Sequence, residues 1–336
     1  MRVIVGVISV KNELITRSLS NHEFDLWDKF VISSPQGTVF HNSKWITTSA
    51  KALGVSCELV GVFDENGEMM AGVPIFYRKR YGLPYVTSTL PMSPASGFML
   101  SVDMSKYRRE NEEKAYSYLN SIRNYLENKK CIFTFIQNYP EMMDLRPFTW
   151  NGWSSKVNYT YQLNLSSENW QFSKDIRRNC TKAKKDGISI NVEYLPDEYW
   201  ELNVDTYQKQ GLEVPFSKRY LKSLMDVAIN NNMGEMWVAK SPDGEIAAVD
   251  FILWDHKLVN RWSSASNSKY KKTGATSLLL CTIFTEMYSR GYDTMNLMAA
   301  NTPHLAKFVS GFSPSLVPYY SVYRMKRPLN FIQKLL

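Results

Sequence analysis

The sequence predicts an α/β protein with mixed sheets, built as two domains of one fold. Four observations support this prediction. The chain has 336 residues, a length typical of two domains. Its apolar positions switch repeatedly between strand spacing and helix spacing, and one hairpin pattern occurs twice. Hydrophobic residues make up 44% of the chain and charged residues 21%, which is enough apolar material for two cores.

The repeated hairpin gives the domain organisation. The sequence ELVGVFDENGE at 58–68 resembles EMWVAKSPDGE at 235–245, and the two copies keep a constant offset of 177 residues. Each copy reads as a strand, an Asn-Gly or Asp-Gly turn and a second strand, which is a strong hairpin signal. Because the copies lie half a chain length apart, we predict two related domains, residues 1–155 and 156–336.

Three elements are expected in the first half. Residues 3–10 form a β-branched run that predicts a strand rather than a signal peptide, because no small-residue cleavage site follows it. Residues 105–129 carry apolar side chains at helical spacing, and residues 131–136 read as a buried strand after that helix.

The second half repeats this alternation. Residues 170–186 predict a helix that ends at Gly187, followed by a strand over 188–194. Residues 274–290 predict a second long helix, which Gly291 ends.

Apolar runs and cysteine spacing indicate the compartment. The longest apolar runs are shorter than the roughly 18 residues that a spanning helix needs, so we expect no transmembrane segment. The four cysteines are widely spaced and form no CxxC pair, which argues against a secreted disulfide framework and a zinc ribbon. We therefore expect a cytoplasmic protein.

Several reaction classes lack their usual residues. The sequence contains no Walker-type phosphate loop, no dinucleotide-binding glycine pattern and no GxSxG nucleophile elbow. Its four histidines show no metal-ligand spacing, so no metal site is predicted. The reactions that remain depend more on positioning the substrates than on a reactive side chain.

The net charge of +8 is concentrated in three clusters. Clustered cations favour a ligand that carries phosphates, although each cluster taken alone is also compatible with ordinary solvated surface charge. The clusters are Arg78 to Arg80, the run of Arg177, Arg178, Lys182, Lys184 and Lys185, and the run of Lys269, Lys271 and Lys272.

The third cluster leads directly into the helix predicted at 274–290. Thr273 could cap this helix, and Gly274 and Ala275 leave its first turn open to a ligand. Free amides at a helix start bind phosphate, and Lys271 and Lys272 would add positive charge. The alternative is an ordinary capped helix that packs on the core.

Two further features have alternative interpretations. In the helix at 170–186, Arg178 and Lys182 fall on one basic face, which is either a solvated face or a surface for a phosphorylated or nucleic-acid substrate. Asp250 is a carboxylate within an apolar strand. It is either a general base with a raised pKa or half of a cross-strand ion pair with Arg261, and we favour the ion pair.

Several short motifs occur in a familiar order across most of the chain. Together they resemble the FemABX-like, GNAT-fold acyltransferases, which carry two GNAT-type domains in tandem. The motifs are FHNSKW at 40–45, RRNCTKAKKDGI at 177–188, SSASN at 263–267, GATSLLL at 274–280 and GYD at 291–293.

The resemblance implies transfer of an acyl or aminoacyl group to an amine. The expected acceptor is an amino group on a sugar nucleotide, a glycan or a cell-envelope precursor. Acyl-CoA is the expected donor, acting as a co-substrate with no bound cofactor. Peptidoglycan-bridge members carry a Phe-Lys pair near the end of the chain, whereas here Val309 follows Phe308, which favours acyl-CoA over aminoacyl-tRNA. A tRNA-dependent aminoacyltransferase and a non-catalytic binding protein remain the alternatives.

The resemblance also assigns candidate site residues. Donor binding falls to Lys271, Lys272, Gly274 and Ala275, while Asp250 is the candidate catalytic residue because of its place in an apolar strand and not because of the resemblance. No DNA partner is expected. A tRNA partner and peripheral contact with a membrane both remain compatible with the resemblance. The residues expected at the acceptor or the cleft are Trp45, Arg178, Lys182, Asn267 and Phe308.

Overall fold

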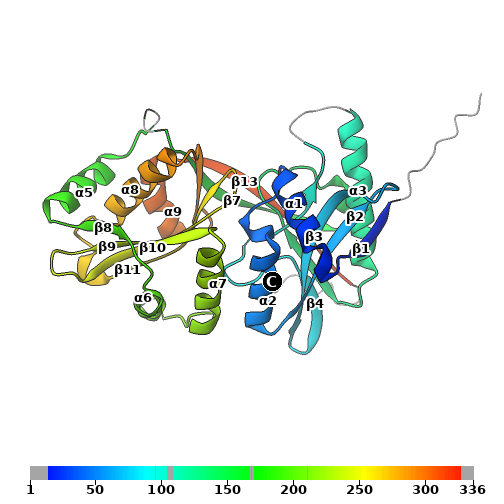
Figure 1. Cartoon of the computed structure of the whole chain (residues 1–336), viewed down its shortest axis with the longest axis horizontal. Helices are drawn as coiled ribbons and strands as arrows, with labels where there is room; N and C mark the ends of the chain where they lie inside the picture. The colour runs from blue at the N-terminus through cyan, green and yellow to red at the C-terminus, as the bar shows by residue number, and fades with distance from the viewer. Residues whose placement is uncertain are drawn as a thin grey trace, which may run out of the picture.

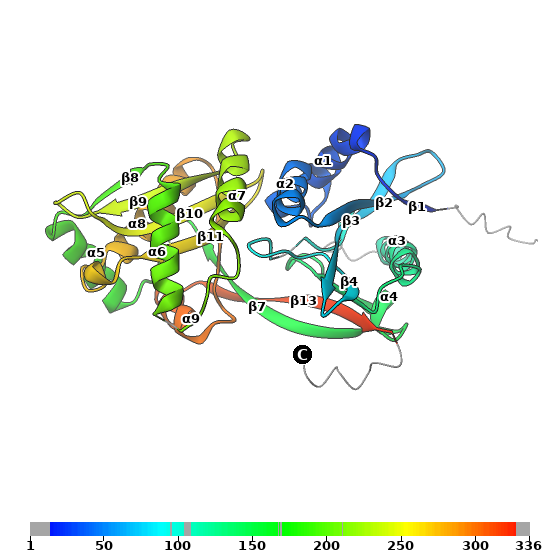
Figure 2. The same ribbon diagram turned by 90° about the horizontal axis from the view of Figure 1, so that it is seen from below.

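Two α/β halves lie side by side and are joined by two long strands, β7 and β13 (Figures 1 and 2). The computed structural model describes residues 14–94, 96–103, 109–166, 168, 170–209 and 211–326. The strand predicted at 3–10 lies outside these residues.

The first half contains the elements up to β7. In chain order they are β1 (Ile15–Ser18), η1 (Asn21–Glu23), α1 (Phe24–Ser33), η2 (Val39–His41), α2 (Ser43–Leu53), β2 (Ser56–Phe63), β3 (Met69–Arg80), β4 (Leu83–Thr87), β5 (Met99–Leu100), α3 (Arg109–Glu127), β6 (Phe133–Gln137), α4 (Arg146–Thr149) and β7 (Ser154–Asn164).

The second half contains the remaining elements. They are α5 (Lys174–Lys185), β8 (Ser189–Val192), α6 (Pro196–Gln208), α7 (Lys218–Asn230), β9 (Gly234–Lys240), β10 (Ile246–Trp254), β11 (Val259–Ser266), η4 (Ser268–Tyr270), α8 (Ala275–Ser289), β12 (Thr294–Met298), α9 (Pro303–Val309), η5 (Ser310–Phe312) and β13 (Ser315–Met325).

The predicted elements are present with shorter bounds. The helix expected from residue 170 begins at Lys174, because Ser173 is its N-cap and its hydroxyl accepts a hydrogen bond from the amide of Ile176 at 3.3 Å. The other predicted helices correspond to α3 and α8, and the predicted strands to β6 and β8. Within the described residues, none of the helices is long and apolar enough to cross a membrane.

The strands form one continuous mixed sheet that runs through both halves. Its order is β1-β2-β3-β4-β6-β13-β7-β12-β11-β10-β9-β8, and β5 pairs with β3 off this path. The C-terminal strand β13 lies between β6 and β7 and is antiparallel to both. Residues 321–325, which the predicted boundary assigns to the second domain, therefore pair with the sheet of the first half.

The repeated hairpin has the same register in both halves. Glu58 pairs with Ile75 in the β2–β3 hairpin, and the residues 177 positions later pair with each other in the β9–β10 hairpin. Each hairpin also has a register shift that leaves one residue of its second strand without a partner, Met70 in the first and Ala247 in the second. These two residues are again 177 apart. The prediction of two halves with a common fold is confirmed.

Helices cover both faces of each half-sheet, because alternate strand residues point to opposite faces. In the first half, α1 and α2 pack with Leu59 on one face, while α3 packs with Val60 on the other. In the second half, α6 and α7 pack with Val238, and α5 and α8 pack with Trp237.

The core between the halves includes Trp45, which we had expected at the acceptor cleft. Its side chain is fully buried, its indole Nε1–H donates to Ser93 Oγ at 2.8 Å, and its ring meets the ring of Trp262 edge-on at 5.4 Å. Trp262 in turn donates to the carbonyl of Met92 at 2.6 Å. The structure thus places Trp45 in the packing that joins the two halves, not on an open surface.

His41 makes the stability of this core depend on pH. Its Nδ1 accepts a hydrogen bond from the Thr38 amide at 3.2 Å, and its Nε2–H donates to the carbonyl of Gly97 at 3.2 Å, so the neutral ring satisfies both neighbours. Burial lowers the pKa of His41 from 6.5 to about 3. The unfolded chain therefore binds a proton below about pH 6.5 that the folded chain does not bind.

The expected result is a loss of stability as the pH falls through this range. Each pH unit below 6.5 costs about 1.4 kcal/mol, so His41 removes about 2 kcal/mol between pH 7 and pH 5. Urea unfolding at both pH values measures the loss, and the His41→Gln variant should show a correspondingly weaker dependence. An identical pH dependence in the two proteins would contradict the assignment.

Candidate active site

A gap opens in the sheet of the second half between two parallel strands. β11 and β12 pair only at Val259 with Met295 and at Asn260 with Asn296. β11 then continues to Ser266, whereas β12 turns away where Met298 and the following residue both adopt left-handed backbone angles. The edge of β11 that faces β12 therefore has no strand partner over residues 261–266.

A buried polar network lies where the two strands part. Tyr139, which follows β6 of the first half, donates its hydroxyl proton to Asn260 Oδ1 at 2.7 Å. It accepts a hydrogen bond from Asn296 Nδ2, also at 2.7 Å. Asn296 Oδ1 accepts from Thr160 Oγ1 at 2.6 Å and from the Met298 amide at 3.0 Å. Burial raises the pKa of Tyr139 well above its ordinary value, so its hydroxyl stays protonated and can act as a hydrogen-bond donor.

A small cavity of about 80 Å³ borders this network and belongs to both halves. This volume holds a few water molecules or a small acyl group. Its lining residues are Pro94, Asn138, Tyr139, Pro140, Tyr159, Thr160, Asn296, Met298, Ala299, Asn301 and Tyr319.

The equivalent gap of the first half is closed by its own chain. β4 and β6 are parallel and pair over three residues, and beyond them the Ser88 amide donates to the carbonyl of Phe135 at 3.0 Å. Gln137 donates its side-chain amide to the carbonyl of Pro94, and its backbone amide donates to Ser88 Oγ at 3.0 Å. The loop between β4 and β5 therefore occupies the space that the second half leaves free.

The predicted donor loop follows β11 through η4. Lys271 and Lys272 are exposed, and within the described residues neither side chain forms an ion pair. Gly274 has a backbone φ of +84°, and a Cβ placed on it would lie 2.3 Å from the carbonyl oxygen of Asn179 on α5. The close contact with α5 is therefore enough to explain why position 274 is a glycine, without any ligand. The amide of Ala275 is already hydrogen-bonded to Thr273 Oγ1 at 3.3 Å.

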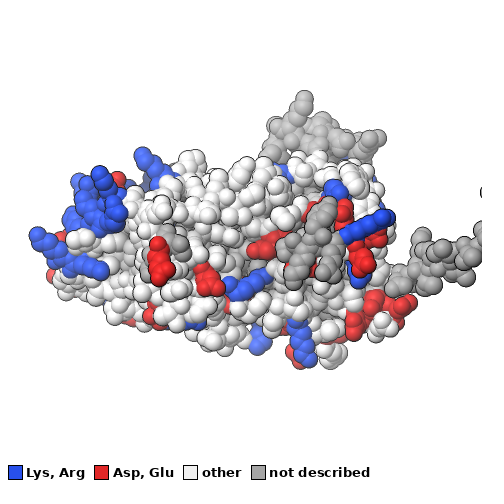
Figure 3. Space-filling model, turned by 90° about the horizontal axis from the view of Figure 1, so that it is seen from above, with Lys and Arg blue, Asp and Glu red and all other residues white. Residues whose placement is uncertain are grey.

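The basic helix α5 covers this loop. Lys182 Nζ donates to the carbonyl oxygen of Lys272 at 2.6 Å, while Arg178 forms an exposed ion pair with Asp175 at 2.9 Å. Lys and Arg side chains gather at this end of the second half (Figure 3). We call this surface the α5 basic patch; its exposed residues are Lys174, Arg177, Arg178, Lys182, Lys184, Lys185, Lys271 and Lys272.

Asp250 forms the ion pair that we favoured. Its Oδ1 lies 2.6 Å from Nε of Arg261, and its side chain is fully buried. Residues 255–258 form the turn between β10 and β11, and Asp250 lies opposite Ser264, so Arg261 reaches Asp250 diagonally. Burial raises the pKa of Asp250, and Arg261 opposes that shift. A catalytic role for Asp250 remains a prediction.

The other two predicted cleft residues lie apart from the cavity. Asn267 caps η4, where its Oδ1 accepts from the Lys269 amide at 3.0 Å. Phe308 packs edge-on against Phe312 at 5.5 Å in the core of the second half. Neither residue lines the cavity of 80 Å³.

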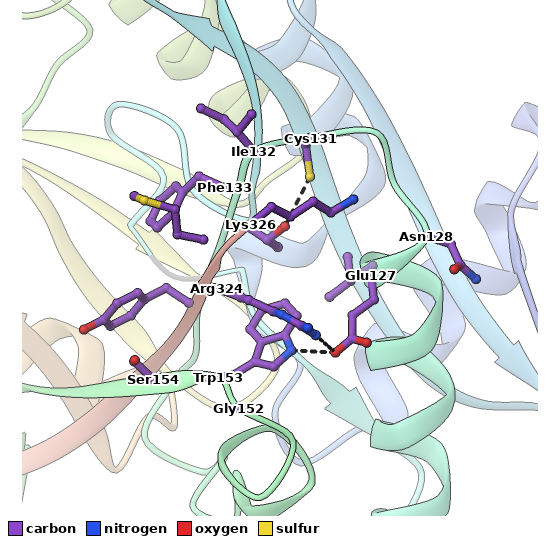
Figure 4. Close-up of a pocket in the computed structure, with 14 residues that line it drawn as sticks. Glu127, Asn128, Cys131, Ile132, Phe133, Gly152, Trp153, Ser154, Arg324 and Lys326 are labelled. Carbon is purple, nitrogen blue, oxygen red and sulfur yellow. Dashed lines mark hydrogen bonds and ion pairs between the residues drawn. The ribbon is translucent and has the colours of Figure 1, made fainter. Parts of the chain in front are cut away.

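A larger open pocket of about 740 Å³ lies at the other end of the first half, beside the end of α3 (Figure 4). Two of its charged residues, Glu127 and Arg324, form an ion pair, and Lys326 donates to the carbonyl of Lys129 at 2.8 Å. Glu127 accepts from Trp153 Nε1 at 2.8 Å and also binds Arg123 and Arg324. Burial alone would raise the pKa of Glu127, but these three partners lower it below its ordinary value. Glu127 therefore stays ionised and holds the end of α3 against β7 and β13.

No group of three or more His, Cys, Asp or Glu side chains in the described ranges could hold a metal ion.

Comparisons with known proteins agree with this architecture. Residues 171–304, which make up most of the second half, match the acetyltransferase (GNAT) domain family. No curated protein sequence matches the chain significantly.

Solved structures extend the likeness to the whole chain. FemX is similar at 12% identity with a TM-score of 0.72, over 96% of this chain and 99% of that one. L-PGS from Bacillus licheniformis is similar at 15% identity with a TM-score of 0.56, over 95% and 96%. A tandem GNAT protein from the clavulanic acid biosynthesis pathway is similar at 10% identity with a TM-score of 0.53, over 93% and 98%. The predicted tandem GNAT fold is confirmed.

Proposed function

We propose that this protein is an N-acyltransferase that moves an acyl group from acyl-CoA to an amino group of a sugar nucleotide, a glycan or a cell-envelope precursor. The observation that carries the proposal is the open gap between β11 and β12 within a GNAT domain. The matching gap of the first half is filled, so the donor is assigned to the second half.

The unpaired edge of β11 supports the assignment of an acyl donor to this place. The free edge of β11 over residues 261–266 is roughly 20 Å long and offers backbone amides and carbonyls to the amide-bearing arm of the donor. Its inner end meets the Tyr139 network, and its outer end continues through η4 to Lys271 and Lys272. A thioester at the inner end would leave its phosphates near the two lysines.

The reaction needs positioning and charge stabilisation. The neutral amine attacks the thioester carbonyl, the oxyanion that forms must be stabilised, and its collapse breaks the C–S bond and releases CoA as a thiolate. In this proposal the Tyr139 hydroxyl turns its single proton from Asn260 Oδ1 to the charge that develops beside it. The amide product retains the acyl group, and the amine proton is lost to solvent.

Direct assay tests the proposal. The purified protein should release free CoA from acyl-CoA only when an amine acceptor is present, and calorimetry should show acyl-CoA binding without an acceptor. A protein that binds no acyl donor would instead be the non-catalytic binding protein that we consider as an alternative.

Replacing both Lys271 and Lys272 with Ala should raise the donor KM. Loss of charged hydrogen bonds to phosphate costs about 1–3 kcal/mol, which corresponds to roughly 5- to 150-fold. The double variant Lys79→Ala/Arg80→Ala removes the same charge from an exposed hairpin of the first half and serves as the matched control. Equal KM values in the two double variants would show that the loop at 271–275 only begins a helix.

The α5 basic patch favours one second candidate, a tRNA-dependent aminoacyltransferase. Eight exposed cations spread over α5 and the adjoining loop form a larger surface than the phosphates of CoA require. RNase treatment of the donor mixture separates the two functions, because it abolishes turnover only where aminoacyl-tRNA is the donor.

A further inference from the structure

Two cysteines from distant parts of the sequence meet between α5 and α8. The Sγ atoms of Cys180 and Cys281 lie 3.2 Å apart, and both side chains are partly buried. Both are free thiols, as are Cys57 and Cys131 in the first half. The sequence gives no CxxC signal for this pair, because 101 residues separate its members.

The pair lies at the contact between α5 and the donor loop. Cys180 directly follows Asn179, whose carbonyl oxygen occupies the space next to Gly274. Lys182, two residues further on, holds the carbonyl of Lys272. A covalent bond at Cys180 would therefore fix α5 against α8 and the loop at 271–275.

We propose that Cys180 and Cys281 form an oxidisable thiol pair whose disulfide locks α5 onto α8. A peroxide is the oxidant. The thiolate of Cys180 attacks one peroxide oxygen, the O–O bond breaks and Cys180 becomes a sulfenic acid, with the other oxygen leaving as water after protonation. Cys281 then attacks the sulfenic sulfur, an S–S bond forms and a second water leaves. Two thiols and one hydrogen peroxide thus give one disulfide and two waters.

The surroundings support this order of events. The hydrogen bond from Cys281 lowers the pKa of Cys180 despite its burial, and Lys184 lowers it further. Burial raises the pKa of Cys57. The sulfur atoms need to approach by only about 1.2 Å to reach disulfide bonding distance.

The test is oxidation of the whole protein with a small excess of hydrogen peroxide. Thiol titration should fall from four to two per chain, and the intact mass should fall by about 2 Da. Peptide mapping without reductant should join the peptides that contain Cys180 and Cys281. Hydrogen exchange over 174–185 should slow, and Tm should rise by at least about 3 °C, reversibly with a thiol reductant.

Three controls make the result decisive. Cys180→Ser and, separately, Cys281→Ser should abolish the linked peptide, whereas the double variant Cys57→Ser/Cys131→Ser should retain it. Stepwise mass gains of about 16 Da without a linked peptide would overturn the proposal, because they show sulfenic and higher acids in place of a disulfide. Linkage through Cys57 or Cys131 would overturn it as well. The mapping of the unsubstituted protein decides the matter even if one variant fails to fold.

Discussion

Replacing Tyr139 with Phe should lower kcat by about 100- to 1,000-fold, the loss expected when a preorganised donor to a developing charge is removed. Tyr139 comes from the first half, and its hydroxyl contacts both Asn260 and Asn296, the last paired residues before β11 and β12 separate. Steady-state kinetics with acyl-CoA and an amine acceptor measure the effect. The donor KM should change little, because the phenyl ring keeps the packing of the tyrosine.

Tyr319→Phe is the matched control. Tyr319 lines the same cavity, but its hydroxyl accepts only a hydrogen bond from Asn301 at 3.2 Å and lies outside the Tyr139 network. Its loss should change kcat by less than about 10-fold. Urea unfolding shows whether the Tyr139→Phe protein is as stable as the unsubstituted one. A Tyr139→Phe protein that is folded and fully active would exclude the assigned role.

The hairpin repeat shows which part of the fold the sequence could predict. Hairpin turns and alternating strands are local patterns, and the β2–β3 and β9–β10 hairpins are present with the same register and the same bulge. Pairing between strands that are distant in the chain is harder to predict from the sequence. No local pattern indicates that β13 returns between β6 and β7, because that position depends on the packing of both halves.

The site was predicted only where its chemistry is local. The lysine-rich approach to α8 could be identified because loop, cap and helix follow one another in sequence. Tyr139, Asn260 and Asn296 were missed, since they come from three separate parts of the chain, the loop after β6, β11 and β12. The available signal was the polar Asn138-Tyr139 pair directly after the strand predicted at 131–136. For Gly274 the structure adds a reason that no local pattern could reveal, because the neighbour that requires a glycine is Asn179, 95 positions earlier in the chain.

The ion pair of Asp250 and Arg261 should give the largest stability effect in the molecule. Asp250 is fully buried, and its Oδ2 has no hydrogen-bond partner, so Arg261 is the counter-charge that makes the buried carboxylate tolerable. Arg261→Ala should therefore cost about 3–5 kcal/mol of unfolding free energy, measured by urea denaturation at pH 7.

Removing both charges should cost much less than removing one. The double variant Asp250→Leu/Arg261→Met fills the same volume with apolar side chains, and such replacements of buried pairs are often neutral. The double variant also separates structure from catalysis. If it folds with normal stability and keeps its kcat, Asp250 serves only to pair with Arg261. A folded double variant that has lost turnover while still binding the acyl donor would instead identify Asp250 as the general base. The apolar side chains would then have restored the packing but not the proton transfer by the carboxylate. A single Arg261→Ala variant as stable as the unsubstituted protein would contradict the electrostatic argument itself, since it would mean that Asp250 is held protonated at pH 7 and needs no counter-charge.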